Sequence, residues 1–165
     1  MTLLTKKNKG RKMNIGINEK KTKEIAKGVS SVLADTYTLY LKTQNFHWNV
    51  TGPRFHQLHA MFEEHYTEMA EAIDEVAERI RALGHKSPGT FKEFLQLTSI
   101  SEETGDIQPD DMIKKLIEGH ESISRKSREV VQMASEYNDE ATADLLTSRM
   151  KTHEKTAWML RSFLQ

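Results

Sequence analysis

Five side chains in the middle of the chain can bind a metal ion and lie at spacings that suit a helix: His47, His59, Glu63, Asp74 and Glu78. The second and third are four residues apart, as are the last two, and residues four apart share one face of a helix. Imidazole combined with carboxylate is a ligand set that suits iron and its neighbours among the transition metals. The spacing therefore makes these five residues candidate ligands of a metal site.

The two pairs cannot bind the same ion within one straight helix. His59 and Asp74 are fifteen residues apart, which corresponds to about 22 Å of rise along a helix. Either the pairs belong to separate sites, or a second copy of the chain supplies the missing half. A two-fold axis across the helix would place each pair opposite the copy of the other, and would create two mixed sites at once.

Four long helices are expected to position these residues. Apolar residues recur at helical spacing and are interrupted by proline and glycine, which predicts helices over residues 18–49, 54–83, 91–95, 109–137 and 140–163. Pro53 suits the first turn of the second helix, where its missing N–H costs nothing, and Gly84 suits the end of that helix. No stretch alternates apolar and polar residues for long enough to form a strand.

This pattern predicts an all-α fold, a ferritin-like four-helix bundle with a short extra helix in the long connection between the second and third long helices. A short loop joins the first two helices, so they should pack antiparallel. His47, near the end of the first helix, should then lie close to His59, one turn into the second. These two histidines and Glu63 can form one half-site, and Asp74 and Glu78 can form the other.

Composition excludes several other classes of protein. The chain has 165 residues, enough for one domain with a substantial core. It has no cysteine, which excludes disulfides, thiolate zinc sites and cysteine nucleophiles. No apolar run approaches the roughly 20 residues of a membrane span. The basic N-terminus lacks the apolar stretch of a secretory signal, so a cytoplasmic protein is expected.

Charge is unevenly distributed although the formal net charge is zero. Residues 1–17 are interpreted as a flexible basic arm, and residues 18–165 as the helical domain. The arm contains five cations, which leaves 19 basic against 24 acidic residues, a net charge of −5, in the remainder. Such an arm either binds DNA without sequence preference or keeps the protein in solution, and translation from Met13 would remove it. The cations are Lys6, Lys7, Lys9, Arg11 and Lys12.

Each candidate ligand also has an ordinary explanation. A histidine near a helix end is commonly a surface or capping residue. Acidic residues four apart on a charged helix commonly form a solvated face. From spacing alone, a metal site and a chance arrangement of ordinary surface residues are equally good explanations of these five residues.

The sequence resembles the Dps family, the DNA-protection-during-starvation miniferritins. The resemblance extends over nearly the whole chain from about residue 18, and it includes the His-x11-His-x3-acid and Asp-x3-Glu spacings. It is carried by Asn45–Val50, Gly52-Pro53, Leu58-His59, Ile73–Ile80, Lys92–Leu95, Ala141–Leu146 and Trp158.

The resemblance implies a ferroxidase that oxidises Fe²⁺, preferably with hydrogen peroxide, and stores Fe³⁺ in a hollow cage of twelve subunits, protecting DNA from oxidative damage. Two irons per inter-subunit site are implied. His47, His59 and Glu63 would come from one subunit, and Asp74 and Glu78 from its two-fold partner. The family often has Asp at the position of Glu63, and Glu keeps the ligand type but is one methylene longer.

Further roles follow from the same resemblance. Trp48, beside the site, would quench radical by-products or pack at the dimer interface. Asp139, Glu140 and Asp144 match a segment that lines acidic iron-entry pores, although acids at a helix start also cap the helix; Asp144 is the better pore candidate.

Two other functions remain as alternatives. One is a nucleoid-associated DNA-binding protein that acts through its lysine-rich arm and whose ferroxidase activity is secondary. The other is a purely structural cage, which no feature of the sequence favours. A larger ferritin is disfavoured because the sequence lacks the Glu-x-x-His pairs of such bundles.

Overall fold

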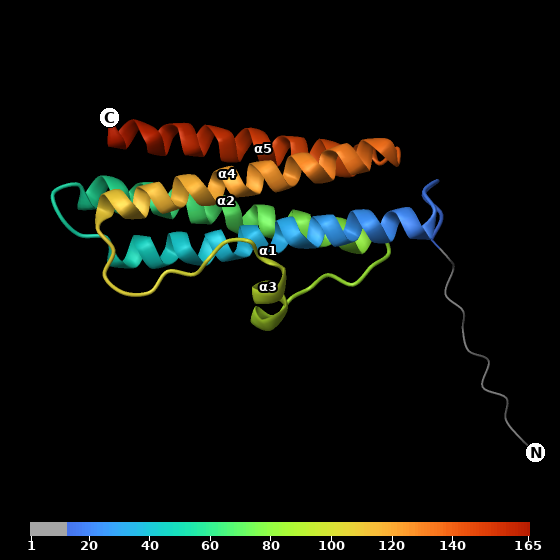
Figure 1. Cartoon of the computed structure of the whole chain (residues 1–165), viewed down its shortest axis with the longest axis horizontal. Helices are drawn as coiled ribbons and strands as arrows, with labels where there is room; N and C mark the ends of the chain where they lie inside the picture. Colours follow the sequence, from blue (N-terminus) through green and yellow to red (C-terminus); the bar gives the residue numbers. More distant parts are fainter. Residues whose placement is uncertain (1–12) are drawn as a thin grey trace, which may run out of the picture.

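Five α-helices and one short 3₁₀ helix, η1, make up the computed structural model, which describes residues 13–165 (Figure 1). The described residues contain no strand, and the predicted all-α fold is confirmed. The five arm cations, Lys6, Lys7, Lys9, Arg11 and Lys12, lie outside the described residues. The elements are α1 (Glu19–Asn49), α2 (Phe55–Ala82), α3 (Phe91–Leu97), α4 (Pro109–Glu136), α5 (Glu140–Arg161) and η1 (Ser162–Leu164).

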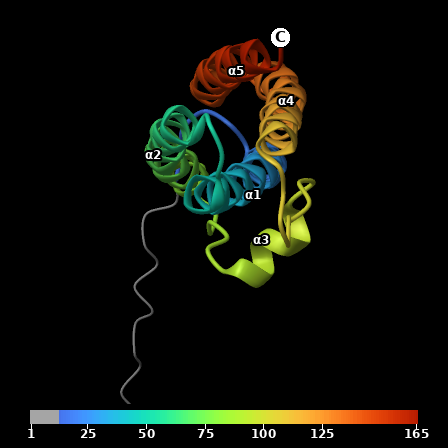
Figure 2. The same ribbon diagram turned by 90° about the vertical axis from the view of Figure 1, so that its left-hand side faces the viewer.

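The four long helices lie side by side as a bundle, and α3 lies outside it against α1 (Figure 2). The chain turns back directly between α1 and α2, and again between α4 and α5. The long connection through α3 instead returns the chain to the end where α2 began, so α2 and α4 run in the same direction (Figure 1). This is the crossover that the sequence predicts.

Local signals set the helix ends. The Asn18 side chain accepts a hydrogen bond from the Lys21 N–H at 3.0 Å and caps α1. Gly84, with φ of +85°, follows α2 as expected. The prediction for Pro53 was wrong, because α2 begins at Phe55. Pro53 instead lies in a turn closed by a 3.0 Å hydrogen bond from the Phe55 N–H to the carbonyl of Gly52.

The core forms where the apolar faces of the four long helices meet. The buried residues of α1 run from Thr22 to His47, and α2 and α4 contribute matching buried faces. Each fully buried side chain of this size stabilises the fold by about 1.5–3 kcal/mol. The largest such side chains are Phe46, Phe62, Ile25, Leu33, Leu39, Leu58, Met69, Ile80, Leu83, Ile113, Leu116 and Ile123.

A buried carboxylate attaches the long connection to α1. Asp35 is 1% exposed. It accepts hydrogen bonds from the Thr98 hydroxyl at 2.8 Å, the Ser99 N–H at 2.6 Å and the Ser99 hydroxyl at 2.9 Å. The Tyr37 and Phe94 rings stack with centroids 4.7 Å apart and hold α3 on the same helix. None of the helices within residues 13–165 has the length and apolar character to span a membrane.

Candidate metal centre

His47 and His59 face each other across the turn between α1 and α2. Their rings stack with centroids 3.7 Å apart and planes 19° apart. The Nδ1 atom of His47 lies 2.7 Å from the carbonyl oxygen of His59. The Nδ1 atom of His59 lies 2.8 Å from the carbonyl oxygen of His47. The structure thus brings together the two histidines that antiparallel packing predicted to be close.

These reciprocal hydrogen bonds fix the position of one hydrogen on each ring. A carbonyl oxygen only accepts, so each Nδ1 must carry the hydrogen that it donates. In a neutral imidazole, Nε2 then keeps its lone pair. A metal-binding histidine is commonly oriented by such a bond from its other ring nitrogen. The carbonyl of His47 can accept because it lies in the last turn of α1, where helix carbonyls lack intrahelical partners.

Two aromatic rings enclose the histidine pair. Phe55 stacks on His59 with centroids 4.9 Å apart and planes 28° apart. Tyr66 presents its edge to His47 with centroids 5.3 Å apart. His47 is only 7% exposed, whereas His59 is half-buried. Packing therefore limits rotation of both imidazoles and holds them in one orientation.

Glu63 lies on α2 one turn beyond His59 and is exposed. It is also close enough to affect Tyr66. Partial burial raises the pKa of the Tyr66 phenol above its ordinary value, and the negative charge of Glu63 raises it further. Glu63 thus lies one turn from His59 along α2, but among the described residues it does not form a three-membered ligand group with His47 and His59, so its place in the half-site stays a prediction.

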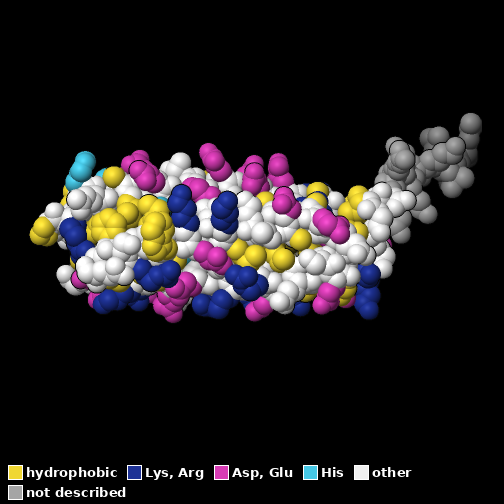
Figure 3. Space-filling view, turned by 90° about the horizontal axis from the view of Figure 1, so that it is seen from above, with side chains coloured by type: hydrophobic (Ala, Val, Ile, Leu, Met, Phe, Trp, Pro, Cys, Tyr) yellow, Lys and Arg dark blue, Asp and Glu magenta, His cyan; other side chains and the backbone are white. Residues whose placement is uncertain are grey.

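Asp74 and Glu78 occupy exposed positions further along α2. Within residues 13–165, no three histidine or acidic side chains of one chain lie close enough to hold a metal ion. One copy of the chain, as far as residues 13–165 show, therefore does not bring the five candidate ligands together into a site. Acidic side chains gather along one edge of the molecule (Figure 3).

Asp139 caps α5 from a buried position. It is 2% exposed, accepts a hydrogen bond from the Thr142 N–H at 3.1 Å and pairs with Arg79 of α2 at 2.7 Å. The capping interpretation is confirmed for this residue, because an internally paired carboxylate is not available to line a pore. Glu140 and Asp144 are exposed and stay pore candidates.

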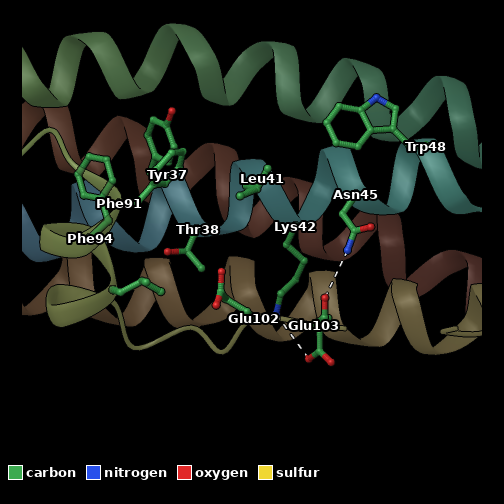
Figure 4. Close-up of a pocket in the computed structure, with 11 residues that line it drawn as sticks. Tyr37, Thr38, Leu41, Lys42, Asn45, Trp48, Phe91, Phe94, Glu102 and Glu103 are labelled. Carbon is green, nitrogen blue, oxygen red and sulfur yellow. Dashed lines mark hydrogen bonds and ion pairs between the residues drawn. The ribbon is translucent and has the colours of Figure 1, made fainter. Parts of the chain in front are cut away.

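Trp48 lies at one end of a groove between α1 and the long connection (Figure 4). The groove has a volume of about 370 Å³. Trp48 is 61% exposed and Phe91, towards the other end, is 68% exposed. Between them the buried Lys42 pairs with Glu103 at 3.7 Å, and burial lowers the pKa of the Lys42 ammonium although Glu103 opposes this. Exposed apolar grooves of this kind mark interaction surfaces.

A second histidine cluster lies inside the bundle and was not predicted. The Nδ1 atoms of His120 and His153 are 2.8 Å apart, and the rings of His65 and His120 meet edge to face at 6.0 Å. Arg149 donates to Nε2 of His153 at 3.4 Å and forms a two-pronged ion pair with Glu68. The sequence signal was available, because both His120 and His153 occupy buried-face positions of their helices.

Burial keeps this cluster uncharged. It lowers the pKa of His65 to about 4 and that of His153 to about 3, with the Arg149 charge as a second cause for His153. The pKa of His120 is likewise well below its usual value, through burial first and then its neighbouring histidines and Arg149. At neutral pH the three imidazoles are therefore uncharged, and they contribute to packing and hydrogen bonding inside the bundle.

The fold and sequence match known proteins over nearly their whole length. The model of a family described as the ferritin-like domain matches residues 26–165. DNA protection during starvation protein 2 of Bacillus anthracis is 40% identical over 142 residues, covering 86% of this chain and 97% of that protein. An uncharacterized low temperature-induced protein of Nostoc is 40% identical over 156 residues, 93% of this chain and 87% of that one.

Solved structures agree with these sequence matches. The Dps protein of Vibrio cholerae O1, described as a member of a broad superfamily of ferritin-like diiron-carboxylate proteins, superposes with a TM-score of 0.89 at 32% identity, covering 94% of this chain and 99% of that one. A Dps protein of Bacillus brevis superposes with a TM-score of 0.86 at 36% identity, covering 88% of this chain and 98% of that one.

Proposed function

Because the chain belongs to the Dps family of ferritin-like proteins, we propose that it stores iron and protects DNA by acting as a ferroxidase. It oxidises Fe²⁺, preferably with hydrogen peroxide, at a di-iron site between subunits and keeps the Fe³⁺ in a hollow cage. Iron is here the substrate and the cargo of the protein.

The observation that carries this proposal is the histidine pair. His47 and His59 each donate Nδ1–H to the other residue's carbonyl, at 2.7 and 2.8 Å, and so keep a free lone pair on Nε2. Two oriented imidazoles with a carboxylate one turn away form an incomplete ligand set for Fe²⁺. Glu63 is that carboxylate, and its longer side chain places the oxygen one methylene further from the backbone than Asp would.

A second copy of the chain supplies the rest of the site. Asp74 and Glu78 are on the same straight helix as His59, about 22 Å and about 28 Å away along its axis, and cannot reach its imidazole. A two-fold axis across α2 brings the partner's copies of these carboxylates to the histidine pair. The exposed apolar groove beside α1 supports burial against further copies, in an assembly that we expect to contain twelve subunits.

The two kinds of ligand divide the chemistry. Imidazoles bind Fe²⁺, and carboxylates stabilise the harder Fe³⁺ product. Two irons in one site each supply one electron, so peroxide is reduced to water without release of hydroxyl radical. With five protein ligands for two irons, water completes the coordination of at least one of them.

The experiment that tests this site removes both imidazoles. The double variant His47→Ala/His59→Ala should oxidise Fe²⁺ with limiting peroxide at least about 10–100-fold more slowly, since loss of even an outer partner of a metal ligand commonly costs that much, as measured by the absorbance of the ferric product. His56→Ala is the matched control, because His56 is an exposed histidine of the same helix outside the proposed ligand set. Oxidation at an unchanged rate in the double variant would refute the assignment.

DNA binding through the arm is the second candidate function, favoured by the five cations within residues 1–12. Twelve arms on one cage would bind DNA multivalently, without sequence preference and with strong salt dependence. Deleting residues 1–12 should abolish retention of DNA in a gel shift at low salt and leave iron oxidation intact. Equal retention by the truncated protein would assign DNA binding to another surface.

A further inference from the structure

Three tyrosines form a continuous row of rings that begins at the histidine pair. We propose that Tyr66, Tyr40 and Tyr37 act as a reservoir for one-electron oxidising equivalents, drawing them away from the iron site and returning them when the next Fe²⁺ binds. This inference rests on the proposed ferroxidase function and adds a redox role for residues outside the ligand set.

The geometry is a chain of adjacent ring contacts. The ring centroid of Tyr66 lies 5.3 Å from that of His47, and the Tyr40 centroid lies 6.1 Å from Tyr66. Tyr37 follows at 5.7 Å from Tyr40. The row therefore crosses from α2 to α1 and then continues along α1 to the groove, where Tyr37 lies near Phe94 (Figure 4). An electron moving along it never has to cross more than one ring contact at a time.

Phenol side chains suit this role because they are among the most easily oxidised groups in proteins. Oxidation of a phenol releases a proton together with the electron. All three tyrosines are only partly buried, so water can exchange protons with their hydroxyl groups.

The reservoir is needed when one iron meets peroxide alone. In that case Fe²⁺ + H₂O₂ gives Fe³⁺ + OH⁻ + •OH, with one electron from iron and cleavage of the O–O bond. The hydroxyl radical takes the phenolic hydrogen atom of Tyr66 and becomes water, leaving a phenoxyl radical. An electron from Tyr40 then reduces that phenoxyl, which regains a proton from water while Tyr40 loses one. The same exchange passes the radical to Tyr37.

The oxidising equivalent returns from Tyr37 through Tyr40 and Tyr66 to the iron site. When a second Fe²⁺ binds, phenoxyl + Fe²⁺ + H⁺ gives phenol + Fe³⁺. The sum is 2 Fe²⁺ + H₂O₂ + H⁺ giving 2 Fe³⁺ + OH⁻ + H₂O, which is the balanced two-electron reduction of peroxide. The row thus lets two irons that arrive separately reach the same products as two irons that react together.

A purely structural role is the alternative, since aromatic contacts stabilise a fold by about 0.5–1.5 kcal/mol each. Tyr→Phe changes separate the two roles, because they keep the ring and remove the oxidisable hydroxyl. The chain supplies its own control. It has four tyrosines, and the fourth, Tyr137, lies apart from the row and hydrogen-bonds to Glu24.

The test uses the full-length assembled protein, given less Fe²⁺ than the sites can hold and then peroxide. Iron oxidation is followed by absorbance, tyrosyl radical by rapid-freeze electron paramagnetic resonance, and escaped hydroxyl radical by spin trapping. The wild type should show a tyrosyl signal. Tyr66→Phe should lose that signal to background and release trapped hydroxyl radical. Tyr40→Phe should confine the radical to Tyr66, and Tyr137→Phe should match the wild type.

The possible failures are distinguishable. If the wild type oxidises iron but Tyr66→Phe keeps the full tyrosyl signal, or Tyr137→Phe alone loses it, the reservoir is wrong and the ferroxidase stands. If the wild type oxidises no iron under any loading, the proposed function is wrong and the reservoir is wrong with it.

Discussion

The buried histidine cluster should make the bundle sensitive to mild acid. Arg149 donates to Nε2 of His153, so the hydrogen of that ring is on Nδ1 and is donated to Nδ1 of His120, 2.8 Å away. His120 cannot gain a proton on Nδ1 without losing this bond, and His153 cannot gain one on Nε2 without losing the bond from Arg149. The nearby charges are Arg149 and Glu68, which already neutralise one another, so an added proton has no counter-ion.

The size of the effect follows from the pKa values. The folded-state pKa is about 4 for His65 and about 3 for His153, against an ordinary value of 6.5. Below pH 6.5 the unfolded chain binds protons that the folded chain does not. Stability is therefore greatest above pH 6.5 and is lost as the pH falls towards the folded-state values. Between pH 7 and 5, each such histidine lowers the free energy of unfolding by about 2 kcal/mol.

Urea unfolding followed by circular dichroism at pH 7, 6 and 5 measures this slope, and carboxylates stay largely ionised over that range. The double variant His120→Leu/His153→Leu removes both rings, so that neither is left without its partner, and keeps the site apolar. The free energy of unfolding of this variant should fall by at least about 2 kcal/mol less than that of the wild type between pH 7 and 5, which is the contribution of His153, and loss of the lowered pKa of His120 should add to this difference. The exposed His56→Ala variant should keep the wild-type slope. Equal slopes in the wild type and the double variant would refute the reasoning.

Two further changes test how the fold is held. Asp139→Ala removes the cap of α5 and a buried ion pair, and it should lower the free energy of unfolding by about 2–5 kcal/mol, as measured by thermal unfolding. The control, Asp144→Ala, should stay within about 0.5 kcal/mol of the wild type. Equal stability of the two variants would contradict the buried cap. Asp35→Ala removes the acceptor of three hydrogen bonds and should cost on the order of 3 kcal/mol, with faster hydrogen exchange at the Ser99 amide. The exposed Asp106→Ala is its control, and unchanged exchange at Ser99 would show that the connection does not depend on this carboxylate.

The fold could be predicted from the sequence because its signals are local. Helix periodicity, the Asn18 cap and Gly84 set element ends to within about two residues. Pro53 was misplaced because a proline suits both the first turn of a helix and the turn before it. The two positions are distinguished only by the hydrogen bond from the Phe55 N–H to the carbonyl of Gly52. That bond forms because the chain reverses direction between α1 and α2.

The candidate site could be predicted only in part. The closeness of His47 and His59 follows from one short loop, but their exchange of hydrogen bonds depends on the detailed geometry of the last turn of α1. Arg79, which decides the role of Asp139, is 60 residues away in the chain. His120 and His153 are 33 residues apart, and nothing local indicates that they meet.

A subunit-mixing experiment tests the central claim, that the iron site exists only between subunits, most directly. The variants His47→Ala/His59→Ala and Asp74→Ala/Glu78→Ala should each oxidise iron far more slowly than the wild type when assembled alone. When they are unfolded, mixed in equal amounts and reassembled, half of the two-fold pairs contain one of each, and each such pair regains one intact site. Peroxide-driven iron oxidation should then return to about a quarter of the wild-type level. No recovery in mixed assemblies would contradict a shared site.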